Sequence, residues 1–309
     1  MNKIQREIIF KVPGSKVFIS DNYKNTRGSF LNISITGEKC ELNCPHCKTH
    51  LLKNMEFFPD SDHFENFIIK KAESGILKGI LISGGFDKDG RLPLGNYLKS
   101  IRKIKNKNPG LKVYTHTGFV EEAEAIKIKK SGIDGVLVNI IASINAIEKV
   151  YNLPGYKPGN YYQTLENLNK AGNKTAPHII IGLDNGKIES EFEAVRQISH
   201  IGADCLVFAI VKKLSKEINF PAIKDTPGKN SDPDPAEILS LISFAQKLMP
   251  QTPISLGCAK PAIKKRGQLE IDLLKNGINI IAFPSQETIN YAIAEKLPYR
   301  FEETCCAGI

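Results

Sequence analysis

One arrangement of hydrophobic and polar positions recurs between residues 30 and 297: an amphipathic helical stretch, a turn with glycine, and a short apolar run rich in β-branched residues. The runs GILISGG at 79–85 and DCLVFAIV at 204–211 are examples. A largely apolar run suits a strand buried on both faces, and a glycine after a helix suits the left-handed position of a C-cap. With FLNISITG at 30–37 as the first strand, we count about eight such β–α units.

These repeats predict an α/β fold, a (β/α)8 barrel of the TIM type, with the active site at the C-terminal ends of the strands. An open, doubly wound sheet is the alternative. Such a barrel typically needs about 250 residues, and the span 30–297 provides enough. We expect residues 1–29 to form an N-terminal extension and residues 298–309 to form a tail that closes over the barrel mouth.

One long connection interrupts the repeats. Residues 213–235 are rich in Pro, Lys and Asp and follow the sixth predicted strand. Loops of this length in a compact domain are usually functional or disordered, and this one lies on the expected active-site face, so we interpret it as a substrate lid. It ends at Asp234, which suits a helix N-cap, with Pro235 at the first helical position.

The composition is that of a globular protein, with 41% hydrophobic and 24% charged residues. The sequence has no apolar stretch near the roughly 20 residues of a membrane span and no signal-peptide pattern at its start. We therefore expect a cytoplasmic protein without a membrane partner. In a reducing compartment its seven cysteines are expected to be metal ligands or catalytic groups rather than disulfides.

The net charge of +9 does not by itself identify a partner. Basic residues are spread along the chain, with only short clusters at 103–107 and 262–266. This distribution favours a solvated, lysine-rich surface over a nucleic-acid interface, and it suits a protein partner with an acidic face equally well.

Three cysteines, Cys40, Cys44 and Cys47, follow the first predicted strand directly. A zinc site with His46 or His50 as the fourth ligand is one interpretation, but such sites usually pair two dyads, and the chain has no second C-x2-C. A [4Fe-4S] cluster held by three thiolates leaves one iron open for a substrate or cofactor. We favour the cluster.

The C-x3-C-x2-C spacing after the first strand resembles the signature of the radical S-adenosylmethionine (SAM) superfamily. The resemblance implies that Cys40, Cys44 and Cys47 hold a catalytic [4Fe-4S] cluster. It further implies that the open iron binds the amino and carboxylate groups of SAM. One electron then cleaves a carbon–sulfur bond of SAM, and the resulting 5′-deoxyadenosyl radical removes hydrogen from an unactivated carbon.

Further motifs resemble the cofactor-binding segments of this family. LISGGFD at 81–87 ends the second strand, and the resemblance implies that Ser83, Gly84 and Gly85 lie where the methionyl amino group is held. Paired glycines let a backbone approach a ligand without a side chain in the way.

VLVNIIAS at 136–143 resembles the biotin and lipoyl synthase pattern H-N-L-D/E-T-S/V, which implies that Asn139 binds the cofactor ribose. Val138 and Ile141 occupy the His and acidic positions of that pattern, so a second polar contact to the ribose is not expected.

HIIIGLDNG at 178–186 resembles the motif G-x-I-x-G-x-x-E, which implies that Ile180 and Gly182 lie along the adenine. His178 and Asn185 replace the terminal residues of that motif. We expect His178 to be a core histidine at the start of a strand.

The other four cysteines divide into two kinds. Cys205 opens the sixth strand and is expected to face the core. Cys258 follows the seventh strand, and Cys305 and Cys306 are adjacent near the end of the chain. We interpret these three as ligands of a second, auxiliary iron–sulfur cluster. Adjacent side chains of an extended segment point in opposite directions, so this requires a bend in the tail.

Within the superfamily the chain resembles the biotin and lipoyl synthase branch, and most closely the two-component, archaeal-type lipoyl synthase subunits. The shared features are SITG..C.L.C.HC, LGC..P and the paired cysteines. The resemblance implies a sulfurtransferase that inserts sulfur from the auxiliary cluster into an octanoyl chain. The implied partners are an octanoylated carrier protein or lipoyl domain, a sister radical enzyme and an electron donor such as ferredoxin.

Two alternatives stay open. One is a radical SAM enzyme of cofactor biosynthesis that acts on a small precursor without sulfur insertion. The other is a non-catalytic metal-binding module. The barrel pattern and the cofactor motifs argue against this second alternative.

Overall fold

The structure is a computed structural model that describes residues 7–45, 47–184, 186–211, 233–260 and 266–309. His46, Asn185 and nearly all of the predicted lid lie outside the described residues. No described helix is long and apolar enough to cross a membrane.

All eight predicted strands form, and they lie side by side in chain order in one parallel sheet. They are β2 (Phe30–Ser34), β4 (Gly79–Ser83), β5 (Lys112–Thr117), β6 (Gly135–Asn139), β7 (Thr175–Ile181), β8 (Leu206–Ile210), β9 (Ile254–Leu256) and β10 (Ile280–Ala282). The repeat of the sequence therefore predicts the order of the sheet correctly.

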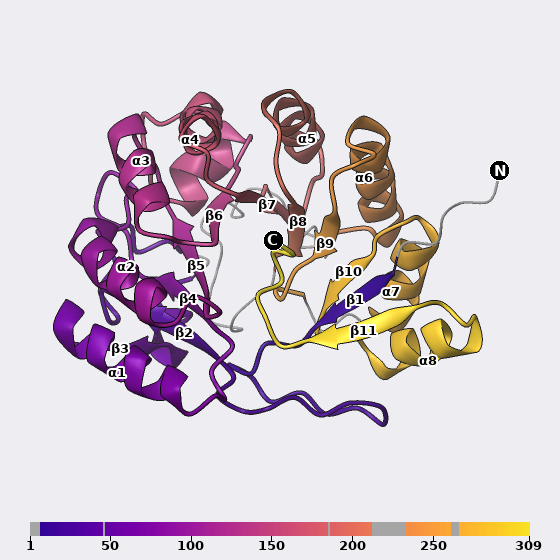
Figure 1. Ribbon diagram of the computed structural model, residues 1–309. Helices are drawn as coiled ribbons and strands as arrows, with labels where there is room; N and C mark the ends of the chain where they lie inside the picture. The colour runs from indigo at the N-terminus through magenta and orange to yellow at the C-terminus, as the bar shows by residue number, and fades with distance from the viewer. Residues whose placement is uncertain (1–6, 46, 185, 212–232, 261–265) are drawn as a thin grey trace.

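The prediction of a closed (β/α)8 barrel is wrong, because the sheet has eleven strands and stays open. Three short strands occupy the edges where closure would take place: β1 (Ile8–Lys11), β3 (Glu56–Phe57) and β11 (Tyr299–Glu302). The strand order is β11-β1-β10-β9-β8-β7-β6-β5-β4-β2-β3, so β1 takes the free edge of β10 and β3 that of β2. The result is a curled, open sheet (Figure 1).

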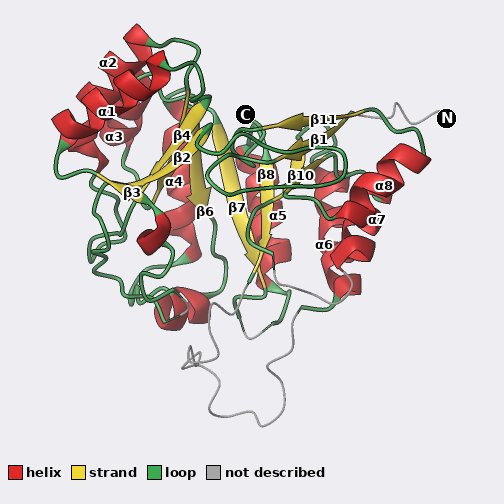
Figure 2. Ribbon diagram, turned by 90° about the horizontal axis from the view of Figure 1, so that it is seen from below, coloured by secondary structure: helices red, strands yellow, loops and turns green. Residues whose placement is uncertain are grey.

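Eight α-helices of the described chain pack on the convex face of the sheet, which excludes the doubly wound alternative (Figures 1 and 2). They are α1 (Ser61–Glu73), α2 (Leu98–Lys107), α3 (Glu122–Lys130), α4 (Pro158–Lys170), α5 (Ser190–Ile201), α6 (Pro235–Leu248), α7 (Arg266–Lys275) and α8 (Gln286–Ala294). Shorter turns are η1 (Leu52–Asn54), η2 (Leu94–Tyr97) and η3 (Ala146–Val150). The Asp234 side chain accepts a hydrogen bond from the Ala236 N–H, which confirms the predicted N-cap of α6.

The strands bury both faces in two separate cores. The larger core lies between the sheet and the helices. A smaller core lines the concave face, which we call the lumen, and includes Phe30, Tyr114, Leu137 and Ala176. Side chains alternate between the two because the side-chain period of a strand is two residues.

The last residues of the sequence fill part of the lumen instead of covering its mouth. The Tyr114 hydroxyl donates to the Ile309 carbonyl at 2.7 Å, and a Cβ on Gly135 would lie 2.5 Å from the Ile309 side chain. Both contacts lie toward the amino-terminal ends of their strands, opposite the expected mouth. The expected tail, 298–309, is therefore the edge strand β11 followed by a buried segment, 303–309.

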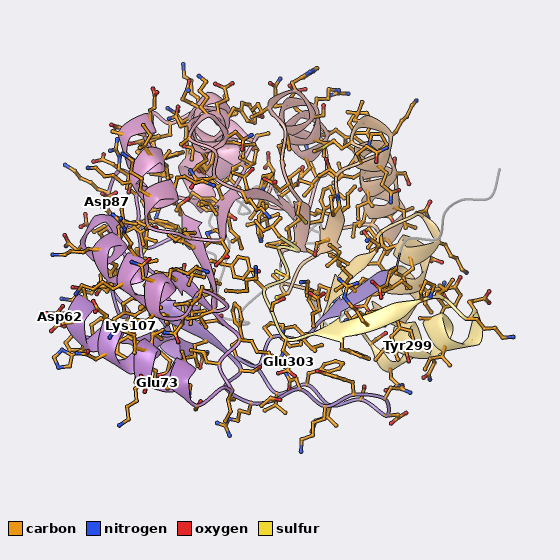
Figure 3. The ribbon with its side chains drawn as sticks, in the orientation of Figure 1. Asp62, Glu73, Asp87, Lys107, Tyr299 and Glu303 are labelled. Atoms are coloured by element: carbon orange, nitrogen blue, oxygen red, sulfur yellow. The ribbon has the colours of Figure 1, made fainter. Side chains whose placement is uncertain are left out.

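Side chains bridge the opening between the two edges of the sheet. Glu303, labelled in Figure 3, follows β11 and accepts hydrogen bonds from the Tyr23 hydroxyl at 2.8 Å, from the Thr26 N–H at 3.0 Å and from the Ser29 hydroxyl. Lys78, just before β4, lies 3.1 Å from the same carboxylate. The predicted N-terminal extension is thus tied to both edges of the sheet.

Candidate active site

The first three cysteines lie on a tight loop that follows β2. The Cys47 N–H donates to the Cys44 carbonyl at 3.0 Å, and the Cys44 thiol donates to the Tyr151 carbonyl at 3.5 Å. Asn43 and Lys48 adopt positive φ angles of 42° and 43°, so the chain reverses on both sides of Cys44. These bends direct Cys40, Cys44 and Cys47 into one cluster.

The exit of β4 lies against this loop. Ser83 is the last residue of β4 and pairs with Ser34 of β2. A Cβ on Gly84 would lie 3.0 Å from the Thr36 hydroxyl, and that hydroxyl accepts a hydrogen bond from the Gly85 N–H at 2.7 Å. The predicted position of this motif beside the cysteine loop is therefore observed.

Gly85 packs directly against the cysteine loop. A Cβ on Gly85 would lie 1.9 Å from the Lys39 carbonyl oxygen and 2.5 Å from the Cys40 Cβ. The next N–H, of Phe86, donates to the Cys40 sulfur at 3.4 Å. The missing side chain therefore lets the cysteine loop approach the strand.

We expect Gly85→Ala to displace the cysteine loop, since backbone cannot move away cheaply from a contact of 1.9 Å. The overpacking should lower the free energy of unfolding by about 1–3 kcal/mol and reduce iron binding. The matched control is Gly110→Ala, because a Cβ at Gly110 meets no atom within 4 Å. Chemical denaturation and iron content after anaerobic reconstitution measure both effects. Equal iron in the two variants would contradict the assignment.

The three thiols of the loop act on one another. Burial, followed by the charges of Cys40 and Cys47, raises the pKa of the Cys44 thiol to about 12. His50 is exposed beside the Lys48 carbonyl. Three thiols without a fourth protein ligand are the set that a cluster with one open iron requires.

A small pocket lies beside the cysteine loop. Its lining includes Leu42 of the cysteine loop, Phe86 after β4 and Asn139 at the end of β6. The Asn139 amide donates to the Tyr151 hydroxyl at 3.3 Å. The structure therefore brings Asn139 and the loop together through Tyr151, a residue that no sequence motif identifies.

Ile180 lies near the end of β7 and lines a second small pocket, and Gly182 directly follows the strand. Gly182 has a φ of +85°, and its N–H donates to the Glu191 carboxylate at 2.9 Å. Burial raises the pKa of Glu191. Asn185 replaces the glutamate of the sequence motif. Glu191, at the start of α5, provides a carboxylate to the Gly182 N–H instead.

The other predicted ligands, Cys258, Cys305 and Cys306, meet in the lumen. The chain bends at Thr304 and turns at 306–307, so both adjacent thiols reach the same place. The neighbouring Cys258 and Cys305 thiols lower the pKa of Cys306 well below its ordinary value. Cys306 in turn raises the pKa of the Cys258 and Cys305 thiols.

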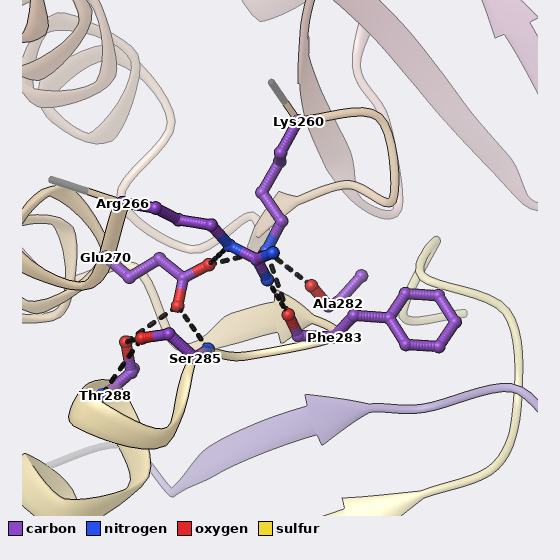
Figure 4. Close-up of polar contacts among 7 residues, drawn as sticks. All are labelled: Lys260, Arg266, Glu270, Ala282, Phe283, Ser285 and Thr288. Atoms are coloured by element: carbon purple, nitrogen blue, oxygen red, sulfur yellow. Dashed lines mark hydrogen bonds and ion pairs between the residues drawn. The ribbon is translucent and has the colours of Figure 1, made fainter. Parts of the chain in front are cut away.

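Two buried lysines lie near these thiols. The charge of Lys260 acts on Cys258, and that of Lys11 acts on Cys305. Lys260 donates to the Glu270 carboxylate at 2.7 Å and to the Ala282 carbonyl (Figure 4). These contacts fix the chain two residues after Cys258. Cationic groups beside the thiols also favour their deprotonated forms.

Two histidine rings, on β5 and β7, lie against each other. The ring centroid of His116 lies 5.4 Å from that of His178. Burial and the neighbouring His178 lower the pKa of His116 to about 3, so this ring stays neutral. His178 lies in the middle of β7 and faces the lumen thiols, whereas we expected it at the start of a strand. Cys205 is buried as predicted, in the lumen core.

Comparisons with known proteins agree with this arrangement. The family model described as "Radical SAM superfamily" matches residues 34–197. The structure of methylornithine synthase (PylB) is similar, with a TM-score of 0.54 and 16% identity over 82% of this chain and 71% of that chain. The structure of HydG, a maturase of the [FeFe]-hydrogenase, has a TM-score of 0.62 and 13% identity over 96% of this chain and 65% of that chain. HydG from Carboxydothermus hydrogenoformans gives 0.58, with 13% identity over 90% and 68%. At these identities the likeness concerns the fold alone, and no curated protein matches the sequence.

Proposed function

The chain belongs to the radical SAM superfamily, and from this premise we propose that it is a sulfurtransferase that inserts sulfur into an octanoyl chain attached to a carrier protein. The enzyme class follows from the family. The sulfur chemistry and the substrate are the proposal. A bound [4Fe-4S] cluster would supply the electron that cleaves SAM.

The observation that carries the proposal is the group of three thiols in the lumen. Cys258 follows β9, and Cys305 and Cys306 lie in the buried last segment, yet Cys306 and the other two thiols shift one another's pKa. A cubane with three thiolate ligands needs such a convergence. A second iron–sulfur cluster held there would supply sulfide as the sulfur source.

The position of this group supports transfer of sulfur to a bound substrate. Cys306 belongs to the lumen core, and the His178 side chain acts on its pKa. The His178 ring centroid lies 5.4 Å from that of His116 of β5. In this proposal the substrate radical would form in the lumen, near the sulfur donor.

The remaining chain supports the proposed partners less directly. A net charge of +9 suits an acidic lipoyl or carrier domain. A sister radical enzyme would share the two insertions that a lipoyl group requires, and a ferredoxin-like donor would provide electrons. These partners rest on the sequence resemblance.

Iron and acid-labile sulfide per chain test the second cluster. We expect about eight irons after anaerobic reconstitution of the unaltered protein, and about four in the variant Cys258→Ala/Cys305→Ala/Cys306→Ala. The control is Cys205→Ser, which alters a lumen cysteine outside this group of three and should keep about eight irons. About four irons in the unaltered protein would remove the proposed sulfur source.

The substrate is tested with an octanoylated lipoyl-domain peptide, SAM and a reductant. We expect mass spectrometry to detect carbon–sulfur bond formation with the unaltered protein and none with the triple variant. Formation of 5′-deoxyadenosine without sulfur in the peptide would favour the other candidate, a radical SAM enzyme that acts on a small precursor.

A further inference from the structure

Much of the positive charge of the protein lies at one end of one half of the sheet. Helices α1–α4 lie side by side, and each ends near the amino-terminal end of the strand that follows it (Figure 1). We call the segments that run from their last turns to β4–β7 the basic end: residues 70–78, 104–112, 127–134 and 167–174. They contain eleven lysines and two carboxylates, Glu73 and Asp134. The excess of eleven over two equals the net charge of the whole chain, +9.

Most lysines of the basic end have no ionic partner. Lys105 and Lys112 lie 2.8 Å and 3.7 Å from Asp134, and Lys78 lies 3.1 Å from Glu303. Eight others form no ion pair with any residue that the structure describes, and all of them except the half-buried Lys71 are exposed: Lys70, Lys71, Lys107, Lys127, Lys129, Lys130, Lys170 and Lys174. A surface with so much uncompensated charge attracts an anionic partner.

Stabilisation of helix ends does not account for this excess. A lysine in the last turn of a helix interacts favourably with the helix dipole, and this benefit applies to all eight helices alike. The corresponding segments of α5–α8 contain three lysines and three carboxylates. They are residues 198–205, 245–253, 272–279 and 291–298. The excess is therefore a property of one half of the molecule.

The opposite ends of the same strands carry the opposite charge. After β4–β7, the loops and the first turns of the following helices are residues 84–101, 118–125, 140–161 and 182–193. These segments contain ten carboxylates and six cations. An anionic partner is therefore steered away from the proposed active-site face and toward the basic end.

The composition of the basic end favours protein carboxylates over nucleic acid as the bound anions. Arginine binds phosphate through two parallel hydrogen bonds, and none of the eleven cations is an arginine. Phosphate groups also bind the free N–H groups of helix N-termini, whereas this surface is built from helix C-termini. The four segments contain no aromatic residue on which a base could stack.

We propose that the basic end binds the acidic face of a partner protein in a transient, electrostatically steered complex. Lysine is depleted in stable interfaces, so a lysine-rich surface suits a complex that forms fast and separates readily. A partner bound there lies at the opposite end of the strands from the cysteine loop and leaves the proposed active-site face open. The inference goes beyond the proposed function, because it needs neither the second cluster nor sulfur chemistry.

Binding of a fluorescent oligoglutamate peptide, which presents the carboxylates of an acidic protein surface, tests the proposal on the full-length protein. The variant Lys107→Gln/Lys129→Gln/Lys130→Gln removes three unpaired charges from the basic end. Because each exposed ion pair contributes little, their combined loss should weaken binding about tenfold at low salt, as measured by fluorescence anisotropy. Urea denaturation verifies that the variant is folded.

The matched control removes three lysines from the corresponding ends of the other half, in the variant Lys247→Gln/Lys275→Gln/Lys296→Gln. It lowers the net charge by the same amount, and we expect it to bind the peptide almost as tightly as the unaltered protein. Equal weakening in the two triple variants would show that net charge alone attracts the peptide, and would overturn the basic end as a binding surface.

Two further measurements test the position and the kind of partner. A carbodiimide joins lysine amines to the carboxylates of the bound peptide, and mass spectrometry should find these cross-links at lysines of the basic end. Cross-links mainly in the loops after β4–β7 would overturn the position. A labelled single-stranded RNA with the same number of charges should bind less tightly than the peptide. Tighter binding of the RNA would overturn the choice of a protein partner.

Discussion

Replacing Cys40, Cys44 and Cys47 together by alanine is expected to abolish the reductive cleavage of SAM. These three thiols are the proposed ligands on the loop after β2, and Cys44 is buried with its sulfur against the Tyr151 carbonyl. Loss of an outer-shell partner at a metal site typically lowers activity by roughly 10–100-fold. The triple variant loses the ligands themselves, so its rate of 5′-deoxyadenosine formation should fall by more than that. Chromatography of the nucleoside product after anaerobic incubation with dithionite measures it.

The matched control is the other triple variant, with Cys258, Cys305 and Cys306 replaced. It removes the same number of thiols from the same protein but leaves the loop after β2 intact. We expect it to keep most of the SAM cleavage while losing about four irons. If both variants cleaved SAM equally well, the cysteines after β2 would not be the initiating ligands.

Glu270→Gln is expected to destabilise the fold far more than the removal of a charge from the protein surface. The Glu270 side chain is only 1% exposed and lies 2.7 Å from Lys260, which is 4% exposed, and 2.8 Å from Arg266. Its second oxygen accepts from the Ser285 N–H and the Thr288 hydroxyl (Figure 4). Without the carboxylate, Lys260 is left as a buried, unpaired charge. Breaking such a pair costs about 3–5 kcal/mol, which urea denaturation measures.

An exposed pair is the control for this prediction. Glu193 and Arg196 lie 3.2 Å apart on α5 and are 49% and 52% exposed. Since a surface ion pair contributes about 0–1 kcal/mol, Glu193→Gln should change the free energy of unfolding by no more than that. Similar losses in the two variants would show that burial does not set the cost.

The pH dependence of stability follows from the same group. The partners of Glu270, Lys260 first, outweigh its burial and lower its pKa from 4.5 to about 2 in the folded protein. The unfolded protein therefore binds the proton first as the pH falls. The contribution of Glu270 is fully present above about pH 4.5 and is lost progressively toward pH 2, and this part of the acid sensitivity should be missing in Glu270→Gln.

Local pattern was enough to predict the strands and the helix ends. Five glycines that follow helices have positive φ angles, as the C-cap prediction requires: Gly75, Gly132, Gly172, Gly202 and Gly277. Each of these features depends on a few neighbouring residues. A helix end or a doubly buried strand leaves its mark in the local sequence, so the eight units could be identified directly.

Closure of the sheet could not be predicted in the same way. Whether β10 pairs with β2 depends on two short segments, IIFK and YRFE, that stand at opposite ends of the sequence and carry no repeat signal. IIFK pairs with β10 on one side and with YRFE on the other. Tertiary packing decides this pairing, for example the packing of Phe10 against Tyr299 and Phe301. In strands of only four residues, the hydrophobic pattern is too short to predict the strand or its partner.

The candidate site shows the same division. Cys40, Cys44 and Cys47 could be found from spacing because all three lie within eight residues. The place of His178 in the middle of β7, with its ring against that of His116, could not be predicted, since it depends on the pairing of strands far apart in the sequence. Tyr151 and Glu191 are likewise ordinary in sequence, and only the fold brings them to the cofactor motifs.

The pairing of β1 has a consequence for synthesis of the protein. Residues 8–11 are made before their two partner strands, 280–282 and 299–302. At about 5–20 residues per second, this apolar strand waits for tens of seconds without a partner. Its unpaired edges are then open to association with other chains. Slow translation between β1 and β10, or the absence of a chaperone that covers residues 8–11, should therefore lower the soluble yield more than the native stability.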